Sequence, residues 1–344
     1  IILFRLGEAV AGPLIMLAVS LFILPSLFLS SLGGELADSR DKAWLAQRLK
    51  LAEIGVQLIA ALGFWFASLP LLFTALFGLG VISALFGPLK YGILPDHLKS
   101  DELPAGNALV EGATFFAILL GLMIGGYAAS HDRDAVSVVL QLMAIALACW
   151  ISSRYIPATG AAAPQLKVDW NVFASTLRIL RELKSDRRAW VGGLAVSWFW
   201  MVGAIVVSLM PIIVKSRMGG GIEVETSISA VFAIGIAAGS IAAAVIAHGR
   251  IMLILVPLAG MAMTLVLIEL MLTTLGLAKA TTEITLHQFL ADAAGLNIAL
   301  GVLGFSFAGG LFVVPIFSAV QLWAGEDRRA RVIAGVNILN SVFI

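Results

Sequence analysis

The feature that most limits the possible folds is a series of long apolar runs, nine of which are about 20 residues long or longer. A helix needs roughly 20 apolar residues to cross the hydrocarbon core of a membrane. Backbone groups in lipid must pair internally, which leaves helices and closed barrels as the possible spanning structures. These runs are continuous and do not alternate with polar residues as barrel strands do. The sequence therefore predicts an all-α membrane protein.

The predicted spans are residues 9–33, 51–69, 71–94, 105–129, 135–157, 189–214, 224–247, 251–275 and 293–321, followed by an incomplete span at 332–344. Both ends of the chain read as cut. The first residues resemble the tail of an earlier apolar segment, and Ile344 falls inside an apolar run that has hardly begun. We expect an internal fragment of a longer bundle.

Composition excludes several classes of function. Hydrophobic residues make up 60% of the chain and charged residues only 12%, against roughly 25% charged in soluble proteins. The net charge of +1 argues against nucleic acid as a partner. Cys149 is the only cysteine, and the four histidines show no metal-ligand spacing. No phosphate loop, nucleophile elbow or zinc motif is present, so we expect no catalytic residue, metal or cofactor.

Loop charges predict the orientation in the membrane. Alternate loops, starting after the first span, carry sixteen Lys and Arg residues, and the other loops carry five. The five are Arg5, Arg133, Lys215, Arg217 and Lys279. Because positively charged loops stay in the cytoplasm, the richer set is predicted to be cytoplasmic.

The chain is predicted to have two halves, residues 1–157 and 189–344, joined by a cytoplasmic linker at 158–188. A short internal repeat supports this division, because Ala105–Leu109 and Ala334–Ile338 open spans with similar residues after charged loops. Repeats of this kind are typical of transporters.

The linker is predicted to hold an amphipathic helix, with Asp169 as a plausible N-cap. Apolar side chains share one face at helical spacing, namely Trp170, Phe173, Leu177 and Leu180. Such a helix would lie at the cytoplasmic lipid interface. The simpler interpretation, a connecting helix without a binding role, is favoured over specific lipid recognition.

Two charged residues fall inside predicted spans at similar depth. Lys90 lies just inside the cytoplasmic end of its helix, and Glu111 lies about two turns inside the next one. A lone charge in the membrane costs on the order of 2.5–3.5 kcal/mol, so each needs a partner, and we predict that they pair or nearly pair. They either meet a substrate headgroup or form a structural ion pair, and Lys90 can also reach the surface by itself.

The segment Gly33–Lys42 ends the first span with two glycines and several charges. Asp38 can accept hydrogen bonds from the N-terminus of a neighbouring helix, and Arg40 and Lys42 can pair with acids. This composition suits a gating contact that breaks and reforms, although an ordinary solvated loop has the same composition.

Small residues four positions apart permit tight helix packing. They occur at Gly121 and Gly125 and again at Gly235 and Gly239, where we predict packing contacts. Glu269 lies deep in an apolar run without an evident partner.

Three stretches resemble known families. The segment from Gly34 to Lys42 is similar to the loop between helices two and three of major facilitator proteins, although Asp41 stands where a glycine is common. The stretch Pro88–Leu94, with Asn107, Glu111 and the glycines at 121–126, resembles the bacterial lysophospholipid transporters of that superfamily. Gly309–Pro315, Gln321 and Asn337 are similar to the same family's later helices.

The resemblance implies a major facilitator fold of two pseudo-symmetric six-helix halves, here truncated at both ends. It implies a multi-pass protein of the bacterial inner membrane that moves lysophospholipids, such as lysophosphatidylethanolamine, to the cytoplasmic leaflet by alternating access. Membrane lipids and a cytoplasmic acyltransferase, fused or separate, are the implied partners. The implied substrate-binding residues are Lys90, Tyr91, Asn107 and Glu111, and the implied gating residues are Gly34, Asp38, Arg40 and Lys42.

Two rival functions remain. A major facilitator exporter of drugs or small amphiphiles would share the fold and the Gly34–Lys42 segment. A membrane anchor for a fused acyltransferase would need no transport at all. A membrane enzyme is least favoured, because the sequence shows no catalytic constellation.

Overall fold

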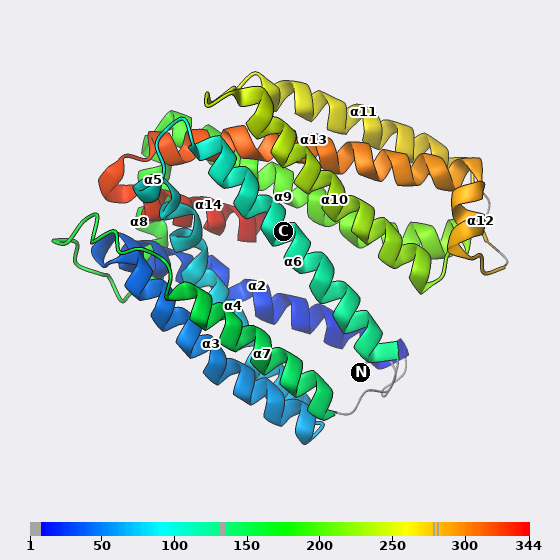
Figure 1. Ribbon diagram of the computed structural model, residues 1–344, viewed down its shortest axis with the longest axis horizontal. Helices are drawn as coiled ribbons and strands as arrows, with labels where there is room; N and C mark the ends of the chain where they lie inside the picture. The colour runs from blue at the N-terminus through cyan, green and yellow to red at the C-terminus, as the bar shows by residue number, and fades with distance from the viewer. Residues whose placement is uncertain (1–7, 131–134, 278, 281) are drawn as a thin grey trace. The chain divides into compact units, whose positions relative to one another are not determined.

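The computed structural model describes residues 8–130, 135–277, 279–280 and 282–344 (Figure 1). Arg5 and Arg133, which were counted for the orientation, lie outside these residues, as does His131. The described chain folds into helices, with one isolated β-bridge between Gly220 and Ile284.

Every predicted span corresponds to a helix. These helices are α2 (Glu8–Ser39), α3 (Lys42–Trp65), α4 (Leu69–Gly92), α6 (Leu103–Ser130), α7 (Ala135–Ser153), α9 (Arg187–Ile213), α10 (Ile222–Ala247), α11 (Leu255–Leu275), α13 (Ala293–Trp323) and α14 (Arg329–Phe343). Shorter elements lie between them, namely α5 (Leu94–His97), α8 (Val172–Ser185), η1 (Val214–Met218), α12 (Leu286–Ala291) and η2 (Glu326–Arg328). Among the described residues, eight helices are long and apolar enough to cross a membrane.

Helix α3 is displaced from the predicted span at 51–69. It begins at Lys42, where the Asp41 carboxylate accepts a hydrogen bond from the Trp44 N–H at 2.7 Å, as an N-cap does. Its first part carries charged residues, of which Lys50 and Glu53 form an ion pair at 2.7 Å. This charged part is why α3 fails as an 18-residue apolar span, although its second half is apolar.

A three-residue turn ends α3 earlier than predicted. Ala67 has a φ of 49°, in the left-handed region, and the Ser68 N–H donates to the Gly63 carbonyl at 2.9 Å. Helix α4 then starts with a proline in its first turn, where the missing N–H costs nothing. The predicted junction near residue 70 is thus confirmed, with the break shifted towards the N-terminus.

The contacts divide the chain into two compact units. The first contains residues 1–97, 127–194 and 323–343, and the second contains 98–126 and 195–322. These units are groups of packed residues in the structure. The division into halves at 1–157 and 189–344 concerns the internal repeat, and it stays a prediction.

In the first unit, α2 packs against α4 and α14, and α3 packs against α4 and α7. Its apolar core gathers small and branched side chains, among them Ala37, Ala46, Ile82, Leu89 and Ala330. Helix α8 lies against both α2 and α14. The linker helix is therefore a packed part of this unit.

In the second unit, α13 is the most enclosed spanning helix, with 72% of its apolar window buried. Glycines allow its close packing on α10. A Cβ atom at Gly239 would lie 1.9 Å from the Phe307 carbonyl oxygen, and one at Gly310 would lie 2.5 Å from the Ile236 oxygen. The packing role predicted for Gly235 and Gly239 is confirmed.

Gly121 and Gly125 behave differently. No described heavy atom lies within 4 Å of a Cβ atom built at either position, so the packing contact predicted there is wrong for this structure. The short glycine pattern on α6 has the spacing of a packing motif, but no described residue of the second unit closes on it.

Glu269 on α11 has polar partners inside the second unit. Its carboxylate accepts a hydrogen bond from the Thr273 hydroxyl at 2.9 Å and one from the Asn297 amide at 3.2 Å. Thr273, one turn away on α11, and Asn297 on α13 therefore hold the acid that had no evident partner in the sequence.

Candidate functional site

Two consecutive glycines near the end of α2 let two other helices approach it. A Cβ atom at Gly33 would lie 2.8 Å from the Leu85 backbone on α4. One at Gly34 would lie 2.9 Å from the Ala330 carbonyl oxygen on α14. Only glycine fits contacts this short, so this pair sets the spacing of α4 and α14 around α2.

Asp38, four residues further along α2, accepts hydrogen bonds from the N-terminal turn of α14. Its fully buried carboxylate receives the backbone N–H groups of Ala330 at 3.0 Å and Arg331 at 3.1 Å. The Arg331 guanidinium adds a third bond through Nε at 3.0 Å. The unpaired N–H groups and positive dipole at a helix N-terminus favour an anion there. We name the contact of Asp38 with residues 330–331 the latch.

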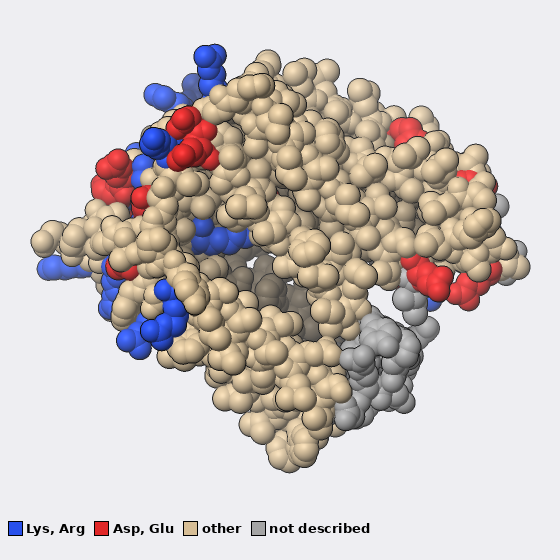
Figure 2. Space-filling model, in the orientation of Figure 1, with Lys and Arg blue, Asp and Glu red and all other residues tan. Residues whose placement is uncertain are grey.

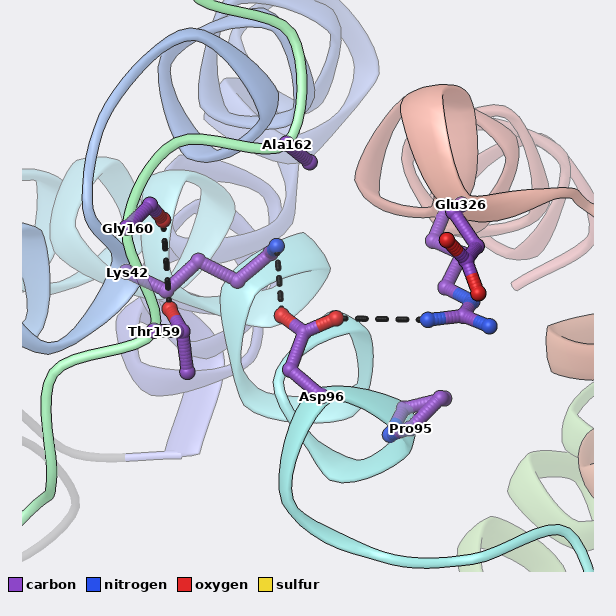
Figure 3. Close-up of a pocket in the computed structure, with 8 residues that line it drawn as sticks. Lys42, Pro95, Asp96, Thr159, Gly160, Ala162 and Glu326 are labelled. Atoms are coloured by element: carbon purple, nitrogen blue, oxygen red, sulfur yellow. Dashed lines mark hydrogen bonds and ion pairs between the residues drawn. The ribbon is translucent and has the colours of Figure 1, made fainter.

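A second charged group extends the latch region. Lys42, 1% exposed, pairs with Asp96 at 2.7 Å, and the other Asp96 oxygen receives Arg329 at 3.3 Å (Figure 3). The group lines a cavity of about 310 Å³ together with Pro95, Thr159, Gly160, Ala162 and Glu326. One carboxylate thus connects the start of α3 to the start of α14.

Arg40 takes no part in these contacts. It is exposed, and its guanidinium lies 5.5 Å from the centre of the Trp44 ring. The arginine that binds Asp38 is Arg331, from the far end of the chain. A gating role for Arg40 stays a prediction.

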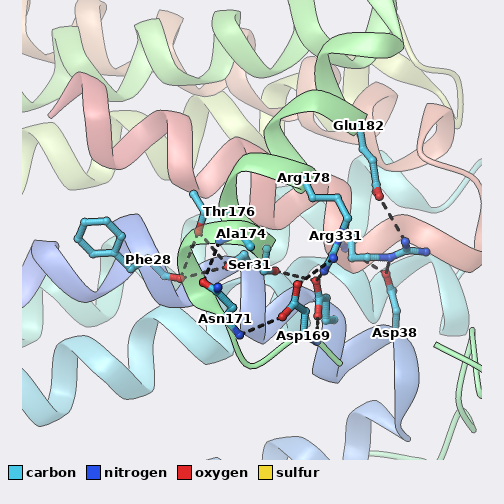
Figure 4. A network of polar contacts seen from close by, with 12 residues as sticks. Phe28, Ser31, Asp38, Asp169, Asn171, Ala174, Thr176, Arg178, Glu182 and Arg331 are labelled. Carbon is cyan, nitrogen blue, oxygen red and sulfur yellow. Dashed lines mark hydrogen bonds and ion pairs between the residues drawn. The ribbon is translucent and has the colours of Figure 1, made fainter. Parts of the chain in front are cut away.

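The buried Glu35 on α2 connects the latch region to the linker. Its carboxylate accepts the Ser175 hydroxyl at 2.6 Å and the Asp169 N–H at 2.7 Å, and it pairs with Arg178 (Figure 4). Arg178 also binds Asp169 at 2.9 Å. Hydrogen bonding to Glu35 raises the pKa of Arg178, and the Asn171 N–H, followed by Arg178, lowers the pKa of Asp169.

Asp41 fastens the start of the linker to the start of α3. Its second carboxylate oxygen accepts the N–H groups of Thr159 at 2.8 Å and Gly160 at 2.6 Å. Burial raises the pKa of Asp41, but hydrogen bonds from the Trp44, Gly160 and Thr159 N–H groups outweigh it, so the pKa lies below its ordinary value.

Lys90 and Tyr91 lie in the last turn of α4, in the first unit. Lys90 is half-buried, and its ammonium lies 4.6 Å from the centre of the buried Tyr91 ring. A cation over an aromatic face is attracted by the ring quadrupole. The aromatic ring therefore partly compensates the charge at the membrane end of the helix.

Glu111 and Asn107 lie on α6, in the second unit, and both are 1% exposed. The Asn107 amide donates to Gln321 at 2.6 Å and to the Ser318 hydroxyl at 3.0 Å, and Gln321 donates back at 3.1 Å. Asn107 thus joins α6 to α13 through a satisfied buried network. Because Lys90 and Glu111 belong to different units, their pairing stays a prediction.

A protein-family model described as Major Facilitator Superfamily matches residues 4–344. The chain belongs to the major facilitator superfamily. It is therefore a multi-pass membrane transporter.

Curated relatives identify its family within the superfamily. The chain is 30% identical to the lysophospholipid transporter LplT of Serratia proteamaculans strain 568, over 87% of this chain and 69% of that protein. It is also 30% identical to LplT of Klebsiella pneumoniae strain MGH 78578, over 89% of this chain and 70% of the relative. This major facilitator protein belongs to the family of the LplT proteins.

Solved structures agree with the major facilitator fold. The human organic anion transporter MFSD10 aligns over 97% of this chain and 75% of its own, with a TM-score of 0.68 and 16% identity. The proton:xylose symporter XylE aligns over 98% of this chain and 78% of its own, with a TM-score of 0.67 and 14% identity.

Sequence reasoning did not select three charged residues of this major facilitator protein, namely Arg331 of the latch and Arg329 and Asp96 beside it. Arg329 and Arg331 stand in the first turn of α14. Cations at a helix N-terminus oppose the dipole, so they need acidic partners from elsewhere. The span predicted at 332–344 left both arginines outside the helix, so this signal appears only with the start of α14 at Arg329.

Proposed function

We propose that this transporter moves lysophospholipids, such as lysophosphatidylethanolamine, across the inner membrane to the cytoplasmic leaflet by alternating access. The observation that carries the proposal is the 30% identity with LplT over 87% of the chain. A lysolipid has one polar headgroup and one acyl chain. Its headgroup crosses hydrocarbon only at a large desolvation cost, which a polar pocket in a helical bundle avoids.

The proposed headgroup site uses Lys90 and Tyr91 on α4 and Glu111 and Asn107 on α6. A half-buried cation beside an aromatic ring suits a phosphate group, and a buried carboxylate suits an ammonium group. The Asn107 amide already donates hydrogen bonds to Gln321 and Ser318 on α13. Its contribution is to hold α6 on α13.

The proposed gate is the latch, together with the Lys42–Asp96–Arg329 group. Its contacts are polar and lie at helix ends, where hydrogen bonds and ion pairs can break and reform. Gly34 contributes by allowing α14 to approach α2.

A cytoplasmic acyltransferase is proposed as the enzyme that consumes the transported lysolipid.

Uptake of labelled lysophosphatidylethanolamine into liposomes containing the protein tests the substrate. Albumin extracts lysolipid from the outer leaflet, so the fraction resisting extraction measures transport. We expect Lys90→Ala and Glu111→Ala to lower the initial rate at least tenfold. Lys99→Ala and Glu283→Ala, at exposed positions, are the matched controls and should transport at the wild-type rate.

Three outcomes would contradict parts of the proposal. Wild-type uptake equal to that of protein-free liposomes, with drug efflux present, would assign the protein to the exporters. Absence of both activities would favour a membrane anchor. Normal rates in both alanine variants would remove Lys90 and Glu111 from the site. For pairing, the exchange Lys90→Glu with Glu111→Lys must recover transport that each single change loses.

A further inference from the structure

The linker forms a hairpin that runs down along α2 and returns along α14, all within the first unit. Its descending branch contacts successively earlier residues of α2. In chain order, the Ala163 N–H donates to the Asp38 carbonyl at 2.7 Å, the Asp169 N–H donates to Glu35 at 2.7 Å, and the Phe173 ring lies 5.0 Å from the Phe28 ring. Beyond this point the chain turns back, and Thr176 contacts Ser31 at 3.1 Å (Figure 4). The tip of the hairpin therefore lies beside Phe28.

That position is inside the apolar part of α2. Phe28 precedes the predicted end of the span, at residue 33, by five residues, or about 7.5 Å at 1.5 Å per residue. A soluble connecting loop has no reason to reach this depth along a membrane helix. The hairpin tip is thus at the level of lipid rather than of bulk solvent.

Helix α8 rises from this tip along α14. Ile179 and Leu183 approach Gly335, Glu182 pairs with Arg331 at 3.6 Å, and Asp186 pairs with Arg328 at 3.7 Å. These contacts move towards the start of α14 as α8 proceeds. The buried side of α8 is therefore fully used by α2 and α14.

The opposite side of α8 is apolar and open. Trp170, just before the helix, is 70% exposed, and Phe173 and Leu177 are 63% and 55% exposed. By contrast, Ser175, Thr176, Ile179 and Leu183 are buried. Three of the four residues of the predicted apolar face, Trp170, Phe173 and Leu177, therefore point away from the protein, and Leu180 is half-buried. The helix starts at Val172 with Asn171 as its cap rather than Asp169.

Basic side chains continue this open face towards the end of α8. Arg181 and Lys184 are exposed and follow Leu177 by one and two turns. Apolar residues at the deep end and cations at the shallow end match the order of acyl chains and headgroups in a leaflet. On the face drawn in Figure 2, charged side chains lie mostly at the left and at the right edge of the view, and uncharged side chains cover the surface between them.

We propose that the open face of α8 binds the cytoplasmic leaflet, with Trp170, Phe173 and Leu177 among the acyl chains and Arg181 and Lys184 on anionic headgroups. Juxtamembrane cations attract anionic lipids, and indole rings favour the interface. The same helix holds Glu35 through Arg178 and Arg331 through Glu182. Lipid bound there therefore steadies a helix that touches both sides of the latch. The proposal does not depend on the transported substrate.

Depth measurements test the insertion. The chain has one cysteine, so Cys149→Ser provides a cysteine-free background. A bimane label at Phe173→Cys or Leu177→Cys should be quenched several-fold more by lipids carrying a nitroxide on the acyl chain than by aqueous iodide. Ser185→Cys, exposed at the end of the same helix, is the control and should show the reverse. Leu177→Cys leaves the contact between Phe28 and Phe173 in place, so it tests the proposal even if Phe173→Cys disturbs folding.

Iodide quenching of residues 173 and 177 as strong as at 185 would overturn the proposal. The proposal would also be overturned if the two labels were shielded from both quenchers in native membranes but accessible to iodide in liposomes. That result would show that a protein partner covers this face. For the headgroups, native mass spectrometry should show several-fold fewer phosphatidylglycerol adducts on the Arg181→Gln/Lys184→Gln variant than on Arg250→Gln. Equal adducts on the two variants would refute the anionic-lipid contact.

Discussion

At the residue scale, the absence of a side chain at Gly34 allows α14 to pack closely against α2. We expect Gly34→Ala to destabilise the protein by about 1–3 kcal/mol, because the new methyl group would meet α14 backbone atoms at 2.9–3.0 Å. Thermal unfolding in detergent measures this. Gly55→Ala on α3 is the control, since no described atom lies within 4 Å of its Cβ position. It should leave stability unchanged or raise it by about 0.5–1 kcal/mol. Equal effects at both positions would contradict the close approach.

Residue chemistry was partly predictable from the sequence. An aspartate at the end of a span beside charged residues indicated an acceptor for a helix N-terminus, and Asp38 receives the N–H groups of Ala330 and Arg331. The donor's identity was not predictable, because residues 38 and 331 are brought together only by packing of α2 on α14. Lys42 was expected to pair with an acid, and Asp96 was found only in the structure.

Helices were predictable because apolar length is a strong signal, and element ends were not. The predicted span at 51–69 missed the charged first part of α3, since window hydropathy discards helices that project beyond the lipid. In the linker, Asp169 and Asn171 are both good cap residues. Asn171 caps α8, with its side chain accepting from Ala174, because Asp169 is engaged by Arg178 and Asn171.

The Asp41 contact gives a pH-dependent link between α3 and the linker. Because its pKa is depressed in the folded protein, the carboxylate stabilises fully above about pH 4, the ordinary value, and this stabilisation is lost as pH falls through the lower folded value. Asp41→Ala should therefore cost about 1–2 kcal/mol at pH 7 and less at the acidic end.

Melting temperatures between pH 3 and pH 7 measure the difference between this variant and the wild type. Asp41→Asn, which keeps the cap but loses the charge, should lie between the two. A difference that is constant over this range would show that the charge of Asp41 contributes nothing.

At the scale of the whole molecule, the latch joins α2, early in the chain, to α14, near its end. Asp38→Asn weakens three hydrogen bonds to a buried charge. If the latch stabilises one state by about 3 kcal/mol, its loss shifts the balance of states on the order of 100-fold. We expect Asp38→Asn and Arg331→Gln to reduce lysolipid uptake at least tenfold, with partial recovery in Arg331→Lys. Wild-type rates in folded Asp38→Asn would exclude a gating role.

The major facilitator fold was predictable at this scale because the apolar runs and the Gly34–Lys42 segment carry it, and the family comparison confirms it. The repeat motifs Ala105–Leu109 and Ala334–Ile338 do lie near the starts of α6 and α14. Packing of the linker helix α8 on α2 and α14 was not predictable, because an amphipathic pattern does not indicate which helices cover its buried side.

The turn after α3 is a position where one substitution could stabilise the protein in detergent. Ala67 holds a backbone conformation that costs an L-residue with a side chain about 1–2 kcal/mol, and glycine adopts it freely. After allowing for the greater freedom of glycine in the unfolded chain, Ala67→Gly should lengthen survival in detergent, with a net gain of about 0.5–1 kcal/mol. A lower melting temperature would show that the turn is relaxed as it stands. The short connection between α3 and α4 is thus a place where the stability of this protein can be raised.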